Sequence, residues 1–320
     1  PVMVSERYSI HTVLDRKTAW VYFAVAMLLS LILLFSFSCR AYAKSPYPDG
    51  MDVFDATVWI MDDTPFVFKD ESLKPGTLTA GTTVKIVAER GDDFYVRAGN
   101  YTGFVPKDVC MINLPDVMQD EMEYDITNSY SSIFKIHGED IEGVTGEVFY
   151  PDVKLENGEF LVPLLFPVAE KLYEAEAYAL SQGSTIKVYD AYRPHDVTKE
   201  LYEKTLEFIG KNPEYKSYVT EGGYNLGAFL ANTASNHNYG VAVDITLVDM
   251  ETGEELEMQT DMHELSPLAV TSKNTYSADM LKTWMETHGF TGIVSEWWHF
   301  EIKGMKKKYA TFQVKPYEDR

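Results

Sequence analysis

The sequence contains only two cysteines, Cys39 and Cys110, among 320 residues. Cys39 lies at the edge of an apolar segment, so no disulfide framework can be built from this pair. Basic residues are also few, since 28 Lys and Arg stand against 49 Asp and Glu, and the net charge is -21. This balance is opposite to that of nucleic-acid-binding proteins, and we expect no nucleic acid among the partners.

Several common catalytic signatures are missing as well. His263-Glu264 is not followed by a second His at the spacing of the helical zinc-protease motif. The sequence has neither a Gly-x-Ser-x-Gly elbow nor a phosphate loop ending in Gly-Lys-Ser or Gly-Lys-Thr. Hydrolysis by a nucleophilic side chain of the protein therefore has little support.

One long hydrophobic run is present, at residues 18–38, and it contains no charged residue. As a helix it would span roughly 30 Å, the thickness of a bilayer core. More basic residues precede the run than follow it: Arg7, Arg16 and Lys17 against Arg40 and Lys44. By the positive-inside rule, residues 1–17 are a cytoplasmic tail and residues 18–38 a transmembrane or signal-anchor helix.

A cleaved signal peptide is the alternative, because Ala41-Tyr42-Ala43 is a small-x-small cleavage site just beyond the run. Both interpretations export the rest of the chain. We therefore expect a single-pass protein of the cell membrane with an extracytoplasmic catalytic domain.

Short alternating strands follow a linker at residues 39–52. Residues 53–113 contain apolar alternation at Val84, Ile86 and Ala88, with turn signals at Gly91 and Gly99. Closely spaced hairpins predict a small all-β barrel. Its closing run, residues 102–106, resembles the end of bacterial Src-homology-3-like domains. That resemblance implies cell-wall binding, and a spacer that binds nothing is the alternative.

Residues 114–120 form a connector, and residues 121–320 alternate helical and strand-like patterns. Residues 167–180 have helical apolar periodicity, and residues 185–189 have the composition of a strand. The second domain is therefore expected to be α+β.

Two segments of this domain place ionisable residues among apolar ones. His237 lies in a polar loop containing Gly240, and Asp244 interrupts an apolar strand pattern. Glu296 and His299 flank Trp297 and Trp298. Two histidines and one carboxylate would complete three of the four positions of a tetrahedral zinc site, and satisfied core histidines are the alternative. Glu296 and His299 would point to opposite faces of a regular strand, so the chain must bend between them.

Four motifs then resemble the VanX-type D-alanyl-D-alanine dipeptidases, in the same order along residues 121–304. The first two are residues 145–150 (Thr-Gly-Glu-Val-Phe-Tyr) and Asp190-Ala191-Tyr192-Arg193-Pro194. The third comprises Ser235, His237, Gly240, Ala242 and Asp244, and the fourth is Glu296-Trp297-Trp298-His299.

This resemblance implies a fold, a cofactor and a set of roles. The fold is an α+β zinc D,D-peptidase domain, here preceded by the Src-homology-3-like barrel and one N-terminal transmembrane helix. One zinc ion is implied, with His237, Asp244 and His299 as ligands. Glu296 becomes the general base, and Arg193 stabilises the negative charge of the tetrahedral intermediate.

Four further residues are assigned to substrate binding: Ser235, Tyr192, Asp261 and His263. In the family, a Met is followed five positions later by an Asp that holds the free amine of the dipeptide. Counting from Met258, this position is His263, and Asp261 takes the role only if the alignment shifts. Unless the alignment shifts, the position that holds the free amine in the family carries no carboxylate in this chain.

The predicted function is hydrolysis of the terminal D-Ala-D-Ala bond of peptidoglycan precursors or stem peptides. Export favours a D,D-carboxypeptidase over a dipeptidase, because stem peptides lie outside the cell. An endopeptidase of the wider family and a non-catalytic wall-binding protein are the alternatives. Expected partners are D-Ala-D-Ala-terminated peptides, the cell wall through the barrel, and the membrane through residues 18–38.

Overall fold

The computed structural model describes residues 51–69, 72–118, 122–124, 134–136, 138–141, 158–219, 225–305 and 309–318. The predicted tail at residues 1–17, the apolar segment at residues 18–38, nearly all of the linker and the motif at residues 145–150 lie outside the described residues. Among the helices that are described, none combines the length and apolar character needed to cross a bilayer. Tyr47–Arg320 forms one compact unit.

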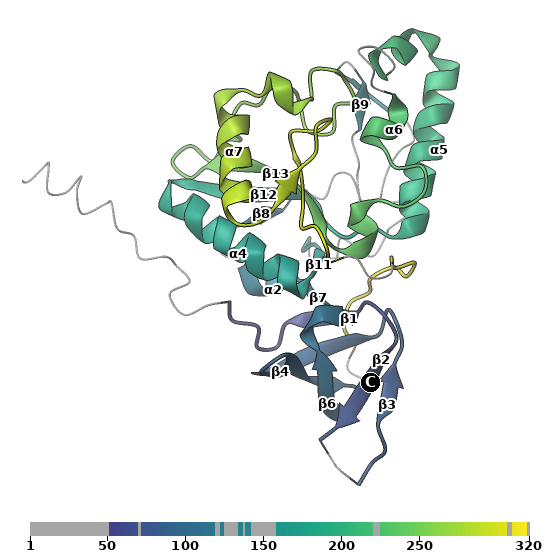
Figure 1. Cartoon of the computed structure of the whole chain (residues 1–320), viewed down its shortest axis with the longest axis vertical. Helices are drawn as coiled ribbons and strands as arrows, with labels where there is room; N and C mark the ends of the chain where they lie inside the picture. The colour runs from purple at the N-terminus through teal and green to yellow at the C-terminus, as the bar shows by residue number, and fades with distance from the viewer. Residues whose placement is uncertain are drawn as a thin grey trace, which may run out of the picture. The chain divides into compact units, whose positions relative to one another are not determined.

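The first part of this unit is an antiparallel sheet (Figure 1). Its strand order is β11-β7-β1-β4-β5-β6-β2-β3. The strands are β1 (Thr57–Ile60), β2 (Thr64–Phe68), β3 (Gly76–Leu78), β4 (Thr83–Arg90), β5 (Asp93–Ala98), β6 (Tyr101–Pro106), β7 (Cys110–Asn113) and β11 (Pro163–Leu165). The hairpins predicted from the turn signals at Gly91 and Gly99 are therefore confirmed.

One detail of the predicted alternation differs. Val84 and Ile86 are buried, whereas Ala88 is only half-buried. The pairing of β4 with β5 shifts between Ile86 and Ala88. Such an irregularity changes the direction in which the following side chains point, so a strict period of two fails there.

The sheet extends past the predicted barrel boundary at residue 113. Strand β11 pairs with β7, with Leu164 opposite Ile112. The C-terminal segment also returns to this sheet, where the indole Nε1 of Trp59 donates to the carbonyl of Lys315 at 2.9 Å. Residues from both predicted domains thus share one hydrogen-bonded sheet.

The second sheet lies within the predicted α+β region and has the order β14-β15-β13-β12-β8. Its strands are β8 (Glu123–Tyr124), β12 (Ser184–Asp190), β13 (Ala242–Asp249), β14 (Thr291–Gly292) and β15 (His299–Glu301). Two short strands, β9 (Lys135–Ile136) and β10 (Glu139–Asp140), form a separate pair. Helices and strands are therefore mixed as predicted, with β12 covering the segment expected to be a strand.

Helices lie on both sides of this sheet in Figure 1, with α4 and α7 on one side and α5 and α6 on the other. The α-helices are α2 (Pro115–Met118), α4 (Phe166–Ser181), α5 (His195–Lys211), α6 (Leu226–Phe229) and α7 (Tyr276–Thr287). The 3-10 turns are η2 (Lys107–Val109), η5 (Pro213–Val219), η7 (Asn236–Tyr239) and η8 (Thr271–Lys273). Helix α4 buries apolar residues such as Val168 and Leu172, as the helical periodicity predicts.

Strand register in the second sheet brings three polar residues into one row. Asp190 at the end of β12 is paired with Asp244 on β13, and Asp244 is paired with His299 on β15. The pairing of β12 with β13 shifts between Val188 and Asp190. Such irregularities often lie beside functional sites because they redirect a side chain.

Candidate metal centre

His237 is positioned by a capped 3-10 turn. The Oγ of Ser235 accepts the backbone N–H of His237 at 3.4 Å, and the backbone N–H of Ser235 donates to Oδ1 of Asn238 at 2.7 Å. A reciprocal capping box thus begins the turn, and the turn ends at Gly240, whose φ is 63°. The Nδ1 of His237 lies 2.7 Å from the carbonyl oxygen of Ala191, which leaves Nε2 directed at the site.

Gly240 is required at the end of that turn for two reasons. Its positive φ is a conformation that favours glycine. A Cβ there would also lie 3.1 Å from Sδ of Met111 and 3.3 Å from the backbone nitrogen of Leu165. The turn that carries His237 is therefore packed directly against the first sheet.

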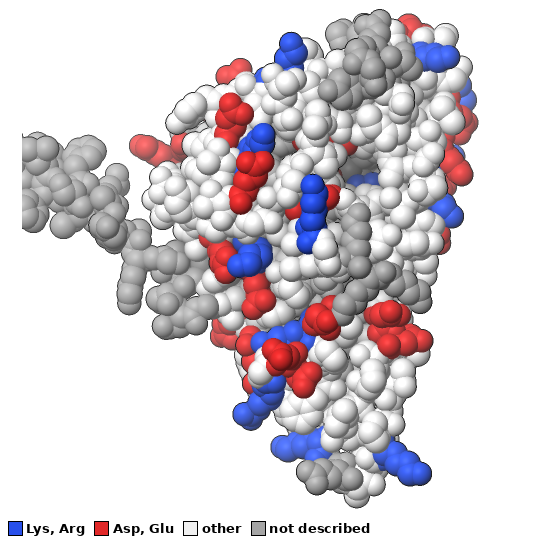
Figure 2. Space-filling model, viewed as in Figure 1, with Lys and Arg blue, Asp and Glu red and all other residues white. Residues whose placement is uncertain are grey.

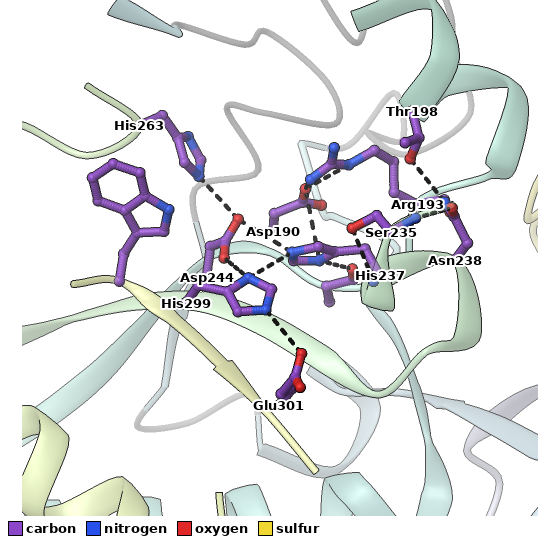
Figure 3. Close-up of polar contacts among 12 residues, drawn as sticks. Asp190, Arg193, Thr198, Ser235, His237, Asn238, Asp244, His263, His299 and Glu301 are labelled. Carbon is purple, nitrogen blue, oxygen red and sulfur yellow. Dashed lines mark hydrogen bonds and ion pairs between the residues drawn. The ribbon is translucent and has the colours of Figure 1, made fainter. Parts of the chain in front are cut away.

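His237, Asp244 and His299 come together as the sequence motif predicts. Their ligand atoms all lie within 4.8 Å of one another, and all three residues are buried. Nδ1 of His299 is 3.0 Å from Oδ1 of Asp244 and 3.3 Å from Nε2 of His237 (Figure 3). Nε2 of His237 is 3.4 Å from Oδ2 of Asp244.

Glu296 lies just before β15, in the bend that the sequence required. Its Oε2 is 3.9 Å from Nδ1 of His299 and accepts the indole N–H of Trp298 at 3.1 Å. Burial raises the pKa of Glu296 from 4.5 to about 8, although the charges of His299 and Arg193 oppose this shift. Glu296 is thus a buried carboxyl group that can hold a proton near neutral pH.

The pKa values of Asp244 and His299 shift in opposite directions. Burial raises the pKa of Asp244, but the charge of His237 and hydrogen bonds from the three neighbouring histidines outweigh burial and hold this pKa well below 3.8. Burial lowers the pKa of His299, yet hydrogen bonds to Asp244 and Glu301 raise it to about 10. Without a metal, Asp244 is therefore ionised and His299 carries the compensating proton.

Arg193 enters the site from the turn after β12. Its Nε and Nη2 both donate to Oδ2 of Asp190, at 2.9 and 2.6 Å. Both side chains are buried, and Asp190 is fully so. The carbonyl of Arg193 accepts the side-chain amide of Asn238 at 2.7 Å, which ties this turn to the one that carries His237.

These side chains share one cavity of about 190 Å³. Its polar lining includes Arg193, Ser235, His237, Asp244, Glu296 and His299. Phe134 and Trp298 contribute apolar walls. Apolar walls around a few convergent polar groups are the usual composition of a ligand site.

The four residues predicted to bind substrate have different surroundings in the structure. Ser235 lines the cavity while also capping η7. Tyr192 is buried, and its hydroxyl donates to the carbonyl of Phe312 at 2.6 Å. The Asp261 side chain is 64% exposed and pairs with Lys135 at 2.7 Å. His263 lies against Asp244, with Nε2 3.2 Å from Oδ2.

Sequence reasoning assigned no role to Asp190, Asn238 or Glu301. Glu301 lies on β15, with Oε2 3.5 Å from Nε2 of His299, and it accepts the side-chain amide of Asn236. The position of Asp190 at the start of the Asp190-Ala191-Tyr192-Arg193-Pro194 motif was a usable signal. Asn238 stands in a polar stretch and Glu301 stands between Phe300 and Ile302, and the roles of both depend on tertiary contacts.

The donor set fits a zinc ion. Two imidazoles and one carboxylate are the ligands of many catalytic zinc sites, which leave a fourth position open. Zinc binds neutral imidazole and ionised carboxylate, so it would replace the proton that His299 otherwise carries beside Asp244. Buried carboxyl groups also outnumber buried Arg side chains here, with Asp190, Asp244, Glu296 and Glu301 against Arg193, so a cation would balance the site.

Residues 144–315 match the family model described as D-ala-D-ala dipeptidase. The chain is 34% identical over 136 residues to the D-alanyl-D-alanine dipeptidase of Escherichia coli (strain K12), a match that covers 40% of this chain and 61% of that protein. It is 25% identical over 173 residues to the D-alanyl-D-alanine dipeptidase of Enterococcus faecium, across 47% of this chain and 79% of that protein. The chain therefore spans less than two thirds of the Escherichia coli relative.

Two solved structures show a low overall similarity. A mutant of the vancomycin resistance D,D-pentapeptidase VanY in complex with Zn(II) is 18% identical with a TM-score of 0.30, across 48% of this chain and 78% of that one. VanYB in complex with D-Alanine-D-Alanine is 17% identical with the same TM-score of 0.30, across 48% of this chain and 76% of that one.

Proposed function

Because this chain belongs to the D-Ala-D-Ala dipeptidase family, we propose that it is a zinc peptidase that hydrolyses the terminal D-Ala-D-Ala bond of peptidoglycan precursors or stem peptides. One observation carries the proposal. The ligand atoms of His237, Asp244 and His299 lie within 4.8 Å of one another. Glu296 and Arg193 line the same cavity as these three residues.

Glu296 is the residue that moves the proton. When bound, zinc would act as a Lewis acid that lowers the pKa of water to about 7 and polarises a carbonyl oxygen. Glu296 is close to His299 and is held by the indole of Trp298, so its carboxylate takes the proton of the attacking water. Its pKa near 8 in the metal-free site shows that the surroundings tolerate the protonated form, which then donates to the leaving amine.

Arg193 supplies the positive charge for the developing oxyanion. Asp190 fixes the guanidinium through Nε and Nη2, so the charge is oriented before the substrate binds. Preorganised charge in a water-poor cavity is worth more than the same charge in water. Asp190 is accordingly a positioning residue, and Arg193 is the group that meets the substrate.

Two observations favour different substrates. The predicted export of the chain supports a D,D-carboxypeptidase, because stem peptides are extracytoplasmic. The relatives in Escherichia coli and Enterococcus faecium are named dipeptidases, which supports free D-Ala-D-Ala as the substrate. The proposal is tested by mass spectrometry of the products formed from a stem pentapeptide and from free D-Ala-D-Ala. Release of D-Ala from the pentapeptide alone would support a carboxypeptidase, and cleavage of the dipeptide alone would support a dipeptidase. Cleavage of neither substrate would contradict the proposed function.

The first sheet is proposed to be a Src-homology-3-like domain that binds the cell wall. Short antiparallel strands and the closing run at residues 102–106 support this assignment. A pull-down with purified peptidoglycan tests it, using the full chain and a variant in which the half-exposed Tyr101 is replaced by Ala. If the same fraction of the full chain stays in the supernatant with and without peptidoglycan, the first sheet would instead be a spacer.

Residues 18–38 are proposed to anchor the chain in the cell membrane as a single span. The apolar run and the excess of basic residues before it support this topology. Added protease should then reach the peptidase region in intact cells that lack an outer membrane, and the protein should fractionate with membranes. Protection from protease would place the peptidase in the cytoplasm and would strengthen the dipeptidase alternative.

A further inference from the structure

His263 occupies a strained position in the loop after β13. Its φ of 57° lies in the left-handed region, which a residue with a Cβ seldom adopts. The loop is held there by strand β9: the backbone N–H of Lys135 donates to the carbonyl of His263 at 3.1 Å, and the N–H of Leu265 donates to the carbonyl of Lys135 at 2.7 Å. A strained conformation persists only where the surroundings enforce it, and such residues cluster at functional sites.

Aromatic rings enclose the imidazole of His263. Its centroid lies 5.1 Å from that of Phe134, 6.1 Å from that of Tyr189 and 5.6 Å from that of Trp298. The residue is 1% exposed. Packing from three sides restrains the ring, and its Nε2 contacts the metal centre at Asp244.

That contact is made to Oδ2 of the Asp244 carboxylate, which also lies 3.4 Å from Nε2 of His237. Nε2 of His263 is 3.2 Å from Oδ2 of Asp244, and an ionised carboxylate can only accept, so Nε2 carries the hydrogen. The other oxygen, Oδ1, lies 3.0 Å from Nδ1 of His299. Figure 3 shows His263 approaching Asp244 from the side opposite to His237 and Arg193.

We propose that His263 is a positioning residue that orients Asp244 as a metal ligand, rather than a residue that contacts the substrate. The inference rests on the proposed function, because it assumes a metal ion at His237, Asp244 and His299. His263 is absent from the described residues that line the 190 Å³ cavity, which agrees with a role behind the ligand. Groups that hold metal ligands typically contribute 10- to 100-fold to metal affinity or activity.

A consequence concerns substrate choice. The imidazole is buried and its Nε2 hydrogen is directed at Asp244, so this position supplies no carboxylate to pair with an ammonium group. A free dipeptide would have to place its desolvated amine against another acid, whereas the amide of an acylated peptide needs no such partner. The geometry of His263 therefore favours substrates with a blocked amine.

The test compares zinc affinity and kinetics in three full-length variants. His263→Leu removes the donor and keeps much of the volume, whereas His263→Gln places an amide N–H near the position of Nε2. His195→Gln is the matched control, since His195 is a buried histidine that stacks on Tyr309 outside the cavity. Zinc affinity is measured by competition with a chromophoric chelator, which requires no substrate.

We expect His263→Leu to bind zinc about 10- to 100-fold more weakly and to lose kcat with little change in KM. His263→Gln should recover most of the affinity, and His195→Gln should match the wild type. If His263→Leu does not fold, His263→Asn replaces it, because its shorter amide does not reach Oδ2 of Asp244.

Two other outcomes overturn separate claims. Unchanged zinc affinity with a raised KM in His263→Leu would make His263 a substrate contact and would overturn this inference alone. A wild-type chain that binds no stoichiometric zinc would overturn the proposed function itself.

Discussion

Asp190 holds Arg193 through a single carboxylate oxygen, with Nε and Nη2 of the guanidinium at 2.9 and 2.6 Å from Oδ2. Asp190 is also paired with Asp244 across β12 and β13, so one strand register places the arginine and the metal ligands side by side. The register shift before Asp190 is therefore part of the site, because it sets which face of β12 carries this side chain.

Removing the Asp190 carboxylate should damage both stability and turnover. Breaking a buried ion pair from one side leaves an uncompensated charge, which costs about 3–5 kcal/mol. Asp190→Asn should lower Tm and kcat, as measured by thermal unfolding and steady-state kinetics. The control is Asp196→Asn, whose side chain is 80% exposed and should change neither quantity. A wild-type Tm and kcat for Asp190→Asn would show that Arg193 needs no partner.

Gly240 provides a test of how the His237 turn is built. Gly240→Ala adds a methyl group 3.1 Å from Sδ of Met111 at a φ of 63°. Gly253→Ala is the control, because its φ is 71° and its Cβ would meet nothing within 4 Å. Both variants carry the left-handed backbone cost of about 1–2 kcal/mol. Only Gly240→Ala should lose more than this in urea unfolding and also weaken zinc binding, and equal losses in the two variants would argue against the packing role.

The raised pKa of Glu296 predicts how the stability of the metal-free protein depends on pH. The folded state retains a proton on this carboxyl between pH 4.5 and about 8, where the unfolded state has released it. The free energy of unfolding should therefore fall as pH rises through this window. Glu296→Gln cannot titrate, so its decline with pH should be shallower in denaturant titrations at pH 5 and pH 8. Parallel declines for the two proteins would contradict the burial-driven shift.

Cys110 should be inert in the folded protein. Its thiol is fully buried and donates to the carbonyl of Pro106 at 3.3 Å, and burial raises its pKa far above the usual range. Because the thiolate is the reactive form, iodoacetamide at pH 8 should modify Cys110 only after urea unfolding. Peptide mass spectrometry distinguishes labelling of Cys110 from labelling of Cys39. Rapid labelling of Cys110 in the native protein would show that the start of β7 opens to solvent.

The sequence was most informative where a local motif carried the chemistry. The spacing of His237 and Asp244, and the run from Glu296 to His299, identified the residues that the fold brings together. The bend required between Glu296 and His299 is present, because β15 begins only at His299.

Other relationships depend on register and tertiary packing, which a single sequence does not encode locally. Strand β11 joins the first sheet from beyond the predicted boundary, and Trp59 is hydrogen-bonded to Lys315 across most of the chain. His263 was predicted to face the substrate because of its distance from Met258. The structure places its ring against Asp244, at a left-handed backbone conformation, and neither feature was indicated by the sequence.

The net charge of the protein could be predicted from the sequence, but the positions of its charges could not. Acidic residues outnumber basic ones, and Figure 2 shows both kinds interspersed over the visible face. The sign of the net charge argued against nucleic acid as a partner. The position of each charge relative to the cavity required the fold.

D-Ala release from an N-acylated peptide ending in D-Ala-D-Ala tests the proposed peptidase activity directly, with free D-Ala-D-Ala assayed in parallel. Three samples are compared: zinc-loaded wild type, the same protein after chelation, and zinc-loaded Glu296→Gln. We expect release by the first sample, none by the second, and a loss of about 100- to 10,000-fold in the third with zinc retained. Undiminished release after complete removal of zinc, or by Glu296→Gln, would contradict the proposed zinc-dependent hydrolysis, as would the absence of release from both substrates by the zinc-loaded wild type.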